Sequence, residues 1–155
     1  MKATRVAVVG ALGRMGERVR AALAQDAHLG LAAALEAPGH PEIGSEIEGG
    51  VRVTDDAKAA LADSDVAVVF ATPGPTLDVL RLAVERGVRA VVGTTGFDEL
   101  QRAEIARLAE STAVVLAPNF SVAVNVLGEL VRRACLLYTS PSPRDVEESR
   151  MPSSA

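Results

Sequence analysis

The sequence has little of what marks secreted, metal-binding or membrane proteins. It holds one cysteine, Cys135, among 155 residues, so an internal disulfide is excluded and no cysteine cluster indicates a metal site. The longest apolar runs, such as residues 66–71, are far too short to cross a bilayer. A strand-like run follows Met1 and Lys2 almost directly, which leaves no space for a signal peptide before it. We therefore expect a cytoplasmic protein without a metal site.

The sequence also lacks a block of basic residues. Sixteen Lys and Arg stand against twenty Asp and Glu, for a net charge of −4. Nothing in this balance favours nucleic acid or an anionic membrane as a partner. The length is typical of one domain and is sufficient for a single hydrophobic core.

Apolar runs alternate with helical patterns over most of the length. Strands are predicted at 5–9, 29–35, 51–53, 66–70, 90–92 and 113–116, and helices at 14–25, 56–62, 76–86, 99–110 and 122–137. Several strands are continuous runs of Val, Ala and Leu, as expected where helices cover both faces of a sheet. The order predicts an α/β fold, a Rossmann-like doubly wound parallel sheet followed by a C-terminal helix. Residues 37–50, rich in Gly, Pro and Glu, are predicted to form a surface loop.

The turn after the first strand carries three glycines. It reads Gly10-Ala11-Leu12-Gly13-Arg14-Met15-Gly16, and a helical pattern follows at once. Glycine permits a tight turn and close approach to a pyrophosphate, and the helix start offers unpaired N–H groups. Glu36 ends the next apolar run, twenty positions after Gly16, where a carboxylate can accept hydrogen bonds from a ribose diol. The spacing G-x-x-G-x-x-G differs from the commoner G-x-G-x-x-G, so the prediction of a dinucleotide site depends on this combination.

Two further segments follow predicted strands. They are Gly93-Thr94-Thr95-Gly96 and Ala117-Pro118-Asn119-Phe120-Ser121, and the turn at 70–75 lies in an equivalent place. Carboxyl ends of parallel strands share one edge of the sheet, where ligands bind in open α/β folds. We therefore expect these segments to line one site.

The glycine turn, the Gly-Thr-Thr-Gly segment and residues 118–125 (Pro-Asn-Phe-Ser-Val-Ala-Val-Asn) together resemble 4-hydroxy-tetrahydrodipicolinate (dihydrodipicolinate) reductase, over residues 2–134. The resemblance implies an NAD(P)H-dependent oxidoreductase of the diaminopimelate route to lysine, acting on 4-hydroxy-tetrahydrodipicolinate. It also implies that the glycine turn holds the pyrophosphate, Glu36 the adenosine ribose, and the other two motifs the nicotinamide. The cofactor-binding residues so implied are Gly10, Ala11, Leu12, Gly13, Arg14, Met15, Gly16, Glu36, Gly93, Thr94, Thr95, Ala117, Pro118, Asn119 and Phe120.

The sequence departs from the family beyond residue 134. Family members continue into a second domain with a His-His segment, a catalytic lysine and a Gly-Thr loop, and this chain shows none of them. Its two histidines, His28 and His40, fall in the cofactor half. We therefore expect a dinucleotide-binding domain at 1–134 and a disordered, non-family tail at 135–155. We further expect no catalytic residue, no turnover by this chain alone, and homo-oligomers only with the second domain.

Two substitutions within the matched region also depart from the family. Ala37 stands where many relatives place an arginine that can meet a 2′-phosphate, which favours NADH over NADPH. Ala123 stands where the family motif usually has glycine. Two alternatives stay open: a non-catalytic dinucleotide-sensing domain, and the cofactor domain of another aspartate-pathway dehydrogenase such as homoserine dehydrogenase. Asn119-Phe120-Ser121, following the Gly-Thr-Thr-Gly segment, favours the dipicolinate reductase.

Overall fold

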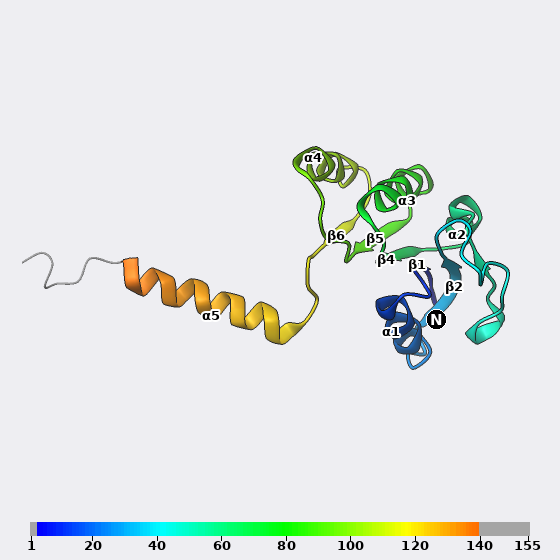
Figure 1. Cartoon of the computed structure of the whole chain (residues 1–155), viewed down its shortest axis with the longest axis horizontal. Coiled ribbons are helices and arrows are strands. Elements are labelled where there is room, and N and C mark those ends of the chain that lie inside the picture. Colours follow the sequence, from blue (N-terminus) through cyan, green and yellow to red (C-terminus); the bar gives the residue numbers. More distant parts are fainter. Residues whose placement is uncertain (1–2, 140–155) are drawn as a thin grey trace, which may run out of the picture. The chain divides into compact units, whose positions relative to one another are not determined.

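The computed structural model describes residues 3–139, with side chains as far as residue 135 (Figure 1). The chain divides into two compact units, Met1–Pro118 and Asn119–Ala155. This division falls earlier than the domain boundary predicted at residue 134, and that boundary stays a prediction. The second unit holds helix α5, Val122–Thr139. The predicted disorder of the tail lies outside the described residues from 140 on, whereas residues 135–139 belong to α5.

The first unit is built on a six-stranded parallel sheet. Its strands have the order β3-β2-β1-β4-β5-β6, and every strand pair in this sheet is parallel. The order runs outward from β1 in both directions, which confirms the predicted Rossmann-like, doubly wound fold. The strands are β1 Thr4–Val9, β2 Leu29–Leu35, β3 Val53–Thr54, β4 Val66–Val69, β5 Arg89–Val92 and β6 Val114–Leu116.

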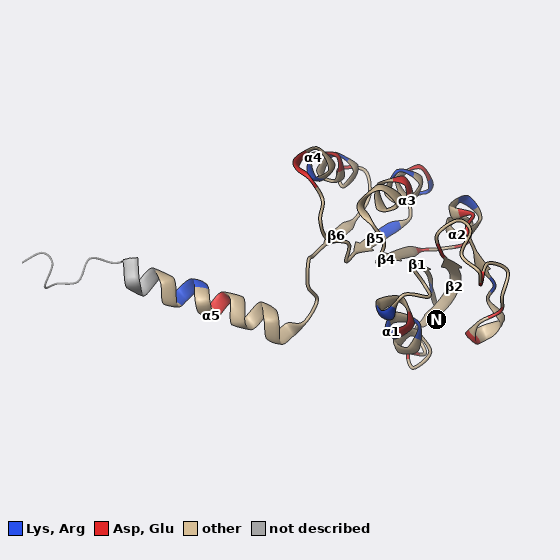
Figure 2. Ribbon diagram, viewed as in Figure 1, with Lys and Arg blue, Asp and Glu red and all other residues tan. Residues whose placement is uncertain are grey.

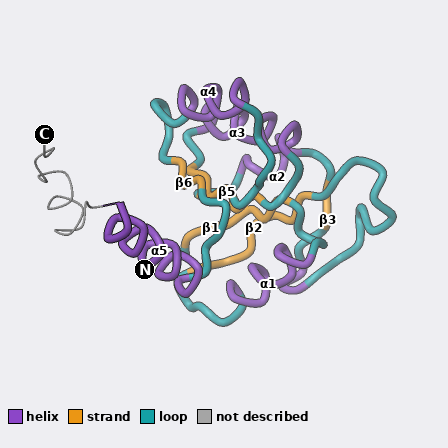
Figure 3. The backbone as a smooth tube through the Cα atoms, turned by 60° about the vertical axis from the view of Figure 1, so that its left-hand side comes forward, coloured by secondary structure: helices purple, strands orange, loops and turns teal. Residues whose placement is uncertain are grey.

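Helices cover the two faces of the sheet unequally. In Figure 3, α2, α3 and α4 lie on one side of the strands and α1 lies on the other. The larger part of the core, with Leu61, Leu80 and Ile105, is on the side of the three helices. The smaller part includes Leu23 of α1 and the partly buried Ile43 and Ile47 of the long loop. The helices of this unit are α1 Arg14–Leu23, α2 Ala57–Ala62, α3 Pro73–Arg86 and α4 Glu99–Leu108, with one 3₁₀ turn, η1 Glu48–Gly50.

The polarity of the sequence explains this layering. Ala7 and Val8 of the central strand are fully buried, as expected for strands with both faces covered. Figure 2 shows that charged residues gather on the helices and loops and are sparse along the labelled strands. The continuous apolar runs therefore form the sheet, and the mixed segments form the cover.

All predicted element boundaries agree with the structure to within three residues. The largest shift is at α3, which begins at Pro73 and not at Thr76. Proline is well suited to the first helical position because its missing N–H has no partner there. The predicted loop at 37–50 also contains η1, and its two isoleucines pack on the core. The sequence does not reveal this packing, because Ile43 and Ile47 are isolated among polar residues and glycines.

Candidate cofactor site

The glycine turn links β1 to α1 at the carboxyl edge of the sheet. Gly10 N and Ala11 N donate to Leu35 O of β2, at 2.9 and 3.2 Å. Gly10 has φ +74°, and a Cβ added there would lie 2.2 Å from Phe70 O. Only glycine fits this position, because a side chain would meet backbone and the φ angle is unfavourable for other residues.

The other two glycines of the turn differ in what surrounds them. A Cβ at Gly16 would lie 2.1 Å from Gly10 O and 2.7 Å from Ala11 Cα, so Gly16 lets α1 pack against the turn itself. A Cβ at Gly13 would meet only Gly10 O, at 3.4 Å, and Gly13 is exposed. The missing side chain of Gly13 therefore leaves open space above the start of α1.

The start of α1 is left without a side-chain cap. Its N-cap residue is Gly13, and no side chain accepts a hydrogen bond there. By contrast, Asp56 caps α2 and Asp98 caps α4 through their carboxylates. α3 also starts without a side-chain cap, but its first residue is Pro73, which has no N–H to offer an anion. The first N–H groups of a helix need acceptors, and an uncapped, exposed helix start suits an anion. Arg14, in the first turn of α1, adds a cation where the helix dipole disfavours one unless an anion is near.

The buried side chain of Arg20 holds the glycine turn in place. Its side chain is buried on α1, and its Nε donates to Ala11 O at 3.0 Å. Its Nη1 forms an ion pair with Glu48 of η1. One guanidinium thus holds both the glycine turn and the long loop to α1.

Glu36 follows β2 and turns its carboxylate toward the glycine turn. Oε2 accepts a hydrogen bond from Leu12 N and Oε1 accepts one from Ala37 N, both at 3.0 Å. Each carboxylate oxygen has more than one lone pair, so both keep acceptor capacity. The side chain is therefore fixed in place and still able to accept from a ribose.

Two cavities meet at the glycine turn. The first, of about 480 Å³, is lined by Glu36, the β4–α3 turn and the acidic side chains Asp55 and Asp78. The second, of about 410 Å³, is lined by Arg14, Met15, Gly16 and the segment after β5. Both include Gly10, Gly13, Phe70, Ala71 and Thr72. The shared lining makes the two cavities neighbouring parts of one site with the start of α1 at its centre.

The segment after β5 forms one wall of the second cavity. A Cβ at Gly93 would lie 2.0 Å from Phe70 Cε1, so the aromatic ring occupies the place of a side chain there. Thr95 is exposed and lines the cavity. Thr94 also lines it but is only 4% exposed, and its hydroxyl lies 2.8 Å from that of Thr76.

The structure brings most of the predicted residues together at this site. Ala11 and Leu12 belong to the turn but line neither cavity: Ala11 is fully buried, and Leu12 contributes its N–H to Glu36. Ala117 and Pro118 follow β6 and end the first unit, with Ala117 N donating to Val92 O at 3.1 Å.

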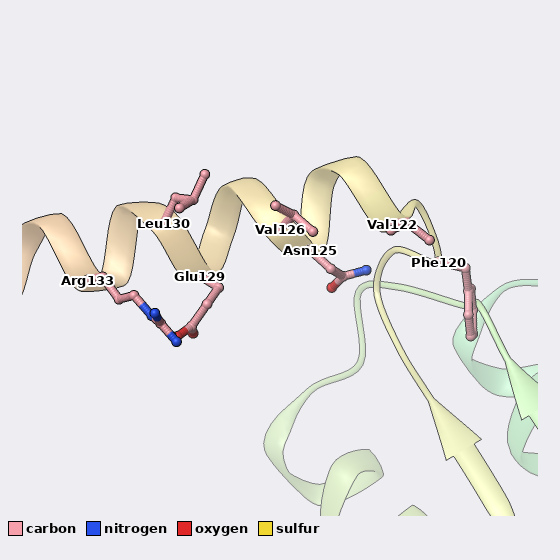
Figure 4. A pocket seen from close by; sticks show the side chains of 7 residues that line it. All are labelled: Phe120, Val122, Asn125, Val126, Glu129, Leu130 and Arg133. Carbon is pink, nitrogen blue, oxygen red and sulfur yellow. The ribbon is translucent and has the colours of Figure 1, made fainter.

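Asn119 and Phe120 belong to the second unit. Asn119 Oδ1 accepts from Ser121 N at 2.7 Å, and Asn125 Nδ2 donates to Asn119 O at 3.2 Å, which shapes the entry to α5. Phe120 lines a hollow of about 560 Å³ along α5 (Figure 4). Glu129 and Arg133, which line the same hollow, point toward each other and form an ion pair at 2.9 Å. The Glu129 carboxylate also accepts hydrogen bonds from Arg132, so the charged groups of the hollow are paired with one another.

Some residues at the site were not singled out from the sequence. The position of the turn at 70–75 after a strand indicated the edge and could have identified Phe70 and Thr72. Asp55 directly follows β3, which is the same signal. Asp78 lines the first cavity, and Thr76 lies behind the second through its contact with Thr94. Both lie inside α3, where nothing in the sequence marks them. Within residues 3–139, no group of three or more His, Cys, Asp or Glu is arranged to hold a metal ion. No helix in that part of the chain has the length and apolar character needed to span a membrane.

The family described as "Dihydrodipicolinate reductase, N-terminus" matches residues 4–120. The chain is 45% identical over 136 residues to the 4-hydroxy-tetrahydrodipicolinate reductase of Thiobacillus denitrificans, covering 84% of this chain and 51% of the relative. It is 44% identical over 155 residues to that of Dechloromonas aromatica, covering 96% and 58%. The chain thus spans little more than half the length of these curated relatives.

Solved structures agree with the fold. Dipicolinate-bound dihydrodipicolinate reductase from Paenisporosarcina sp. TG-14 matches with a TM-score of 0.67 and 26% identity, over 77% of this chain and 49% of that one. Homoserine dehydrogenase of S. aureus matches with a TM-score of 0.55 and 21% identity, over 76% and 33%, a likeness of fold alone. The family match over most of the first unit decides between them, and the chain belongs to the dihydrodipicolinate reductase family, of which it spans the N-terminal, NAD(P)-binding domain.

Proposed function

We propose that the chain binds NAD(P)H across the two cavities, with the pyrophosphate at the uncapped start of α1. The observation that carries this assignment is the meeting of both cavities at Gly13, where a helix start without a cap faces open space. The backbone N–H groups of Arg14, Met15 and Gly16 donate to phosphate oxygens, and the Arg14 guanidinium adds a cation. Gly13 leaves room for the phosphates to approach.

The two ends of the cofactor occupy different cavities in this proposal. The adenosine ribose donates its hydroxyls to Glu36, whose carboxylate is already oriented by Leu12 N and Ala37 N. The nicotinamide lies toward Gly93, Thr94 and Thr95 in the other cavity. The resemblance to the family adds Ala117, Pro118, Asn119 and Phe120 to the nicotinamide end.

We further propose that NADH is preferred over NADPH. The 480 Å³ cavity is lined by Glu36, Asp55 and Asp78, and neither lysine nor arginine is among its lining residues. A 2′-phosphate on the adenosine ribose would be repelled there without a counter-charge. The residue after Glu36 is Ala37, whose side chain cannot compensate.

We propose that the whole enzyme reduces 4-hydroxy-tetrahydrodipicolinate, as a step of lysine biosynthesis. We further propose that the whole enzyme is cytoplasmic and forms a homo-oligomer. The bound dinucleotide supplies the hydride. This domain binds the dinucleotide and orients its nicotinamide, while the substrate and the proton donor are held by the part of the enzyme that the relatives add. We propose that this chain alone is inactive, since neither histidine nor lysine lines the two cavities.

The test is substitution of Glu36. Hydrogen bonds to charged groups contribute about 1.5–3 kcal/mol, so Glu36→Ala is expected to weaken NADH binding about tenfold or more. Isothermal titration calorimetry of both proteins with NADH gives the dissociation constants. NADPH titrated in parallel should bind more weakly than NADH to the unsubstituted chain, and the difference should shrink in Glu36→Ala.

Glu42→Ala is the matched control, because Glu42 lies in the same loop, is exposed and lines neither cavity. It should bind NADH as the unsubstituted chain does. Equal affinities of Glu36→Ala and the parent would remove Glu36 from the site. A clear NADPH preference of the parent would contradict the assignment of cofactor choice.

A further inference from the structure

Two buried threonine hydroxyls join the loops of the nicotinamide end. Thr76 lies in the first turns of α3 and is completely buried, and Thr94 follows β5 and is 4% exposed. Their Oγ1 atoms are 2.8 Å apart. Thr76 lines neither cavity, so it is one step removed from any ligand there.

The direction of the hydrogen bonds follows from the number of protons. Thr76 Oγ1 donates to Thr72 O at 2.9 Å. A hydroxyl has one proton to donate, so the bond between the two hydroxyls is made at the same time only if Thr94 donates it. Thr94 Oγ1 in turn accepts from Ala71 N at 3.3 Å. The chain of bonds therefore runs from Ala71 N–H through Thr94 and Thr76 to the carbonyl of Thr72.

This series of hydrogen bonds begins and ends on neighbouring residues of the β4–α3 turn. Ala71 and Thr72 line both cavities, and Thr94 lines the 410 Å³ cavity with Gly93 and Thr95. The hydroxyl pair thus fixes the segment after β5 against the turn after β4. Because Thr94 donates its one hydroxyl proton to Thr76, this proton is not available to a ligand. Only Thr95 and the backbone of this segment are left to donate to a ligand.

We propose that Thr76 is a positioning residue for the nicotinamide end of the cofactor, acting through Thr94. The proposal rests on the dinucleotide binding proposed above. Without the Thr76 hydroxyl, the buried Thr94 proton has no acceptor, and the Thr94 side chain must turn toward the cavity or toward water. Either change frees the Ala71 amide and moves the wall formed by Gly93, Thr94 and Thr95.

The experiment compares Thr76→Val, which removes the hydroxyl at nearly constant shape, with Thr76→Ser, which keeps it. The matched control is Thr112→Val, since Thr112 Oγ1 also donates to a backbone carbonyl, Val88 O at 3.0 Å. Thr112 lies just before β6 and so at the amino ends of the strands, whereas the cavities lie at their carboxyl ends. Calorimetric titration with NADH and with ADP-ribose, which lacks the nicotinamide, separates the two ends of the cofactor. Amide hydrogen exchange of Ala71 without ligand reports the hydroxyl pair directly.

Thr76→Val is expected to weaken NADH binding about tenfold, to leave ADP-ribose binding unchanged, and to speed exchange of the Ala71 amide. Thr76→Ser and Thr112→Val should match the parent in all three. Unchanged exchange at Ala71, or equal loss of NADH and ADP-ribose, would overturn the positioning role. If Thr76→Val does not fold, Thr76→Cys replaces it, because a thiol is a poor acceptor in the same place. Failure of the parent to bind NADH would contradict the proposed function instead, and the Ala71 exchange would still decide whether Thr76 holds the two loops.

Discussion

Gly16 and Gly74 respond differently to an added methyl group, although both lie in helices near the site. At Gly16 the new Cβ would meet Gly10 O at 2.1 Å, whereas at Gly74 no atom outside the neighbouring residues and the helix's own backbone lies within 4 Å. Gly16→Ala should therefore destabilise the protein by about 1–3 kcal/mol through forced backbone shifts. Gly74→Ala should change the stability by less than Gly16→Ala, because the backbone freedom that alanine removes from the unfolded chain is opposed by the restriction on a residue that precedes a proline, here Pro75. Urea unfolding followed by circular dichroism measures both, and equal stability of Gly16→Ala and the parent would contradict the close packing of α1 on its turn.

Single site residues could be predicted where their spacing along the sequence is fixed by the order of strands and helices. The glycine turn and Glu36 could be identified because strand, turn, helix and second strand impose a fixed spacing. Arg20 could not, since nothing in the sequence separates it from the exposed Arg18 two positions earlier. The contact of Thr76 with Thr94 depends on the packing of α3 against the end of β5, which local sequence does not encode. Cofactor contacts of the glycine turn, Glu36 and Thr94 remain predictions.

At the scale of elements, the strands were predicted well because short continuous runs of Val, Ala and Leu are typical of strands with both faces covered. The start of α3 was placed three residues late, because Pro73, Gly74 and Pro75 together are typical of a turn. In the structure the prolines occupy the first helical turn, where missing N–H groups cost nothing. The packing of Ile43 and Ile47 was missed since the loop carries no period that would assign it a face.

An ion pair between α3 and α4 makes their packing sensitive to pH. Arg81 Nε and Nη2 bind the two carboxylate oxygens of Glu104 at 2.8 and 3.0 Å. The hydrogen bond from Arg81, more than its charge, lowers the pKa of Glu104 below the usual 4.5. A lowered pKa means that the folded protein binds the proton less tightly than the unfolded chain, so the stabilisation is present above pH 4.5 and is lost as the pH falls through the folded-state pKa.

Glu104→Gln should accordingly reduce the free energy of unfolding near pH 7, and the difference from the parent should vanish in acid below that pKa. Urea unfolding at a series of pH values measures this. Glu110→Gln is the control, because Glu110 is an exposed residue just beyond α4. A difference that persisted unchanged into strong acid would mean that lost packing, and not the ion pair, causes the effect.

At the scale of the whole molecule, the chain represents about half of its relatives. General acid catalysis typically contributes 10²–10⁴-fold, and neither cavity of the first unit is lined by His28, His40 or Lys58. We expect NADH oxidation by the 155-residue chain to stay at background with freshly generated 4-hydroxy-tetrahydrodipicolinate, as followed by NADH absorbance.

A fusion of this chain, cut after about residue 134, to the C-terminal part of a close relative should restore turnover. The same fusion carrying Glu36→Ala serves as its control, with a raised KM for NADH. Robust turnover by the chain alone would show that its own residues supply the proton and hold the substrate.

The central place of β1 has a consequence for how the sheet forms during synthesis. β1 is synthesised before the other strands of the sheet. It can pair with β2 on one side early, but its other side stays unpaired until β4 has been synthesised. The bond from Arg5 N to Asp65 Oδ2 at 2.8 Å closes a loop of 60 residues, and such distant pairings form slowly. Until residues 66–69 have left the ribosome, the apolar β1 presents an open edge, which is a template for wrong pairing. The strand that leads into the cofactor turn is thus the one exposed longest, and pauses in translation between β2 and β4 lengthen that exposure.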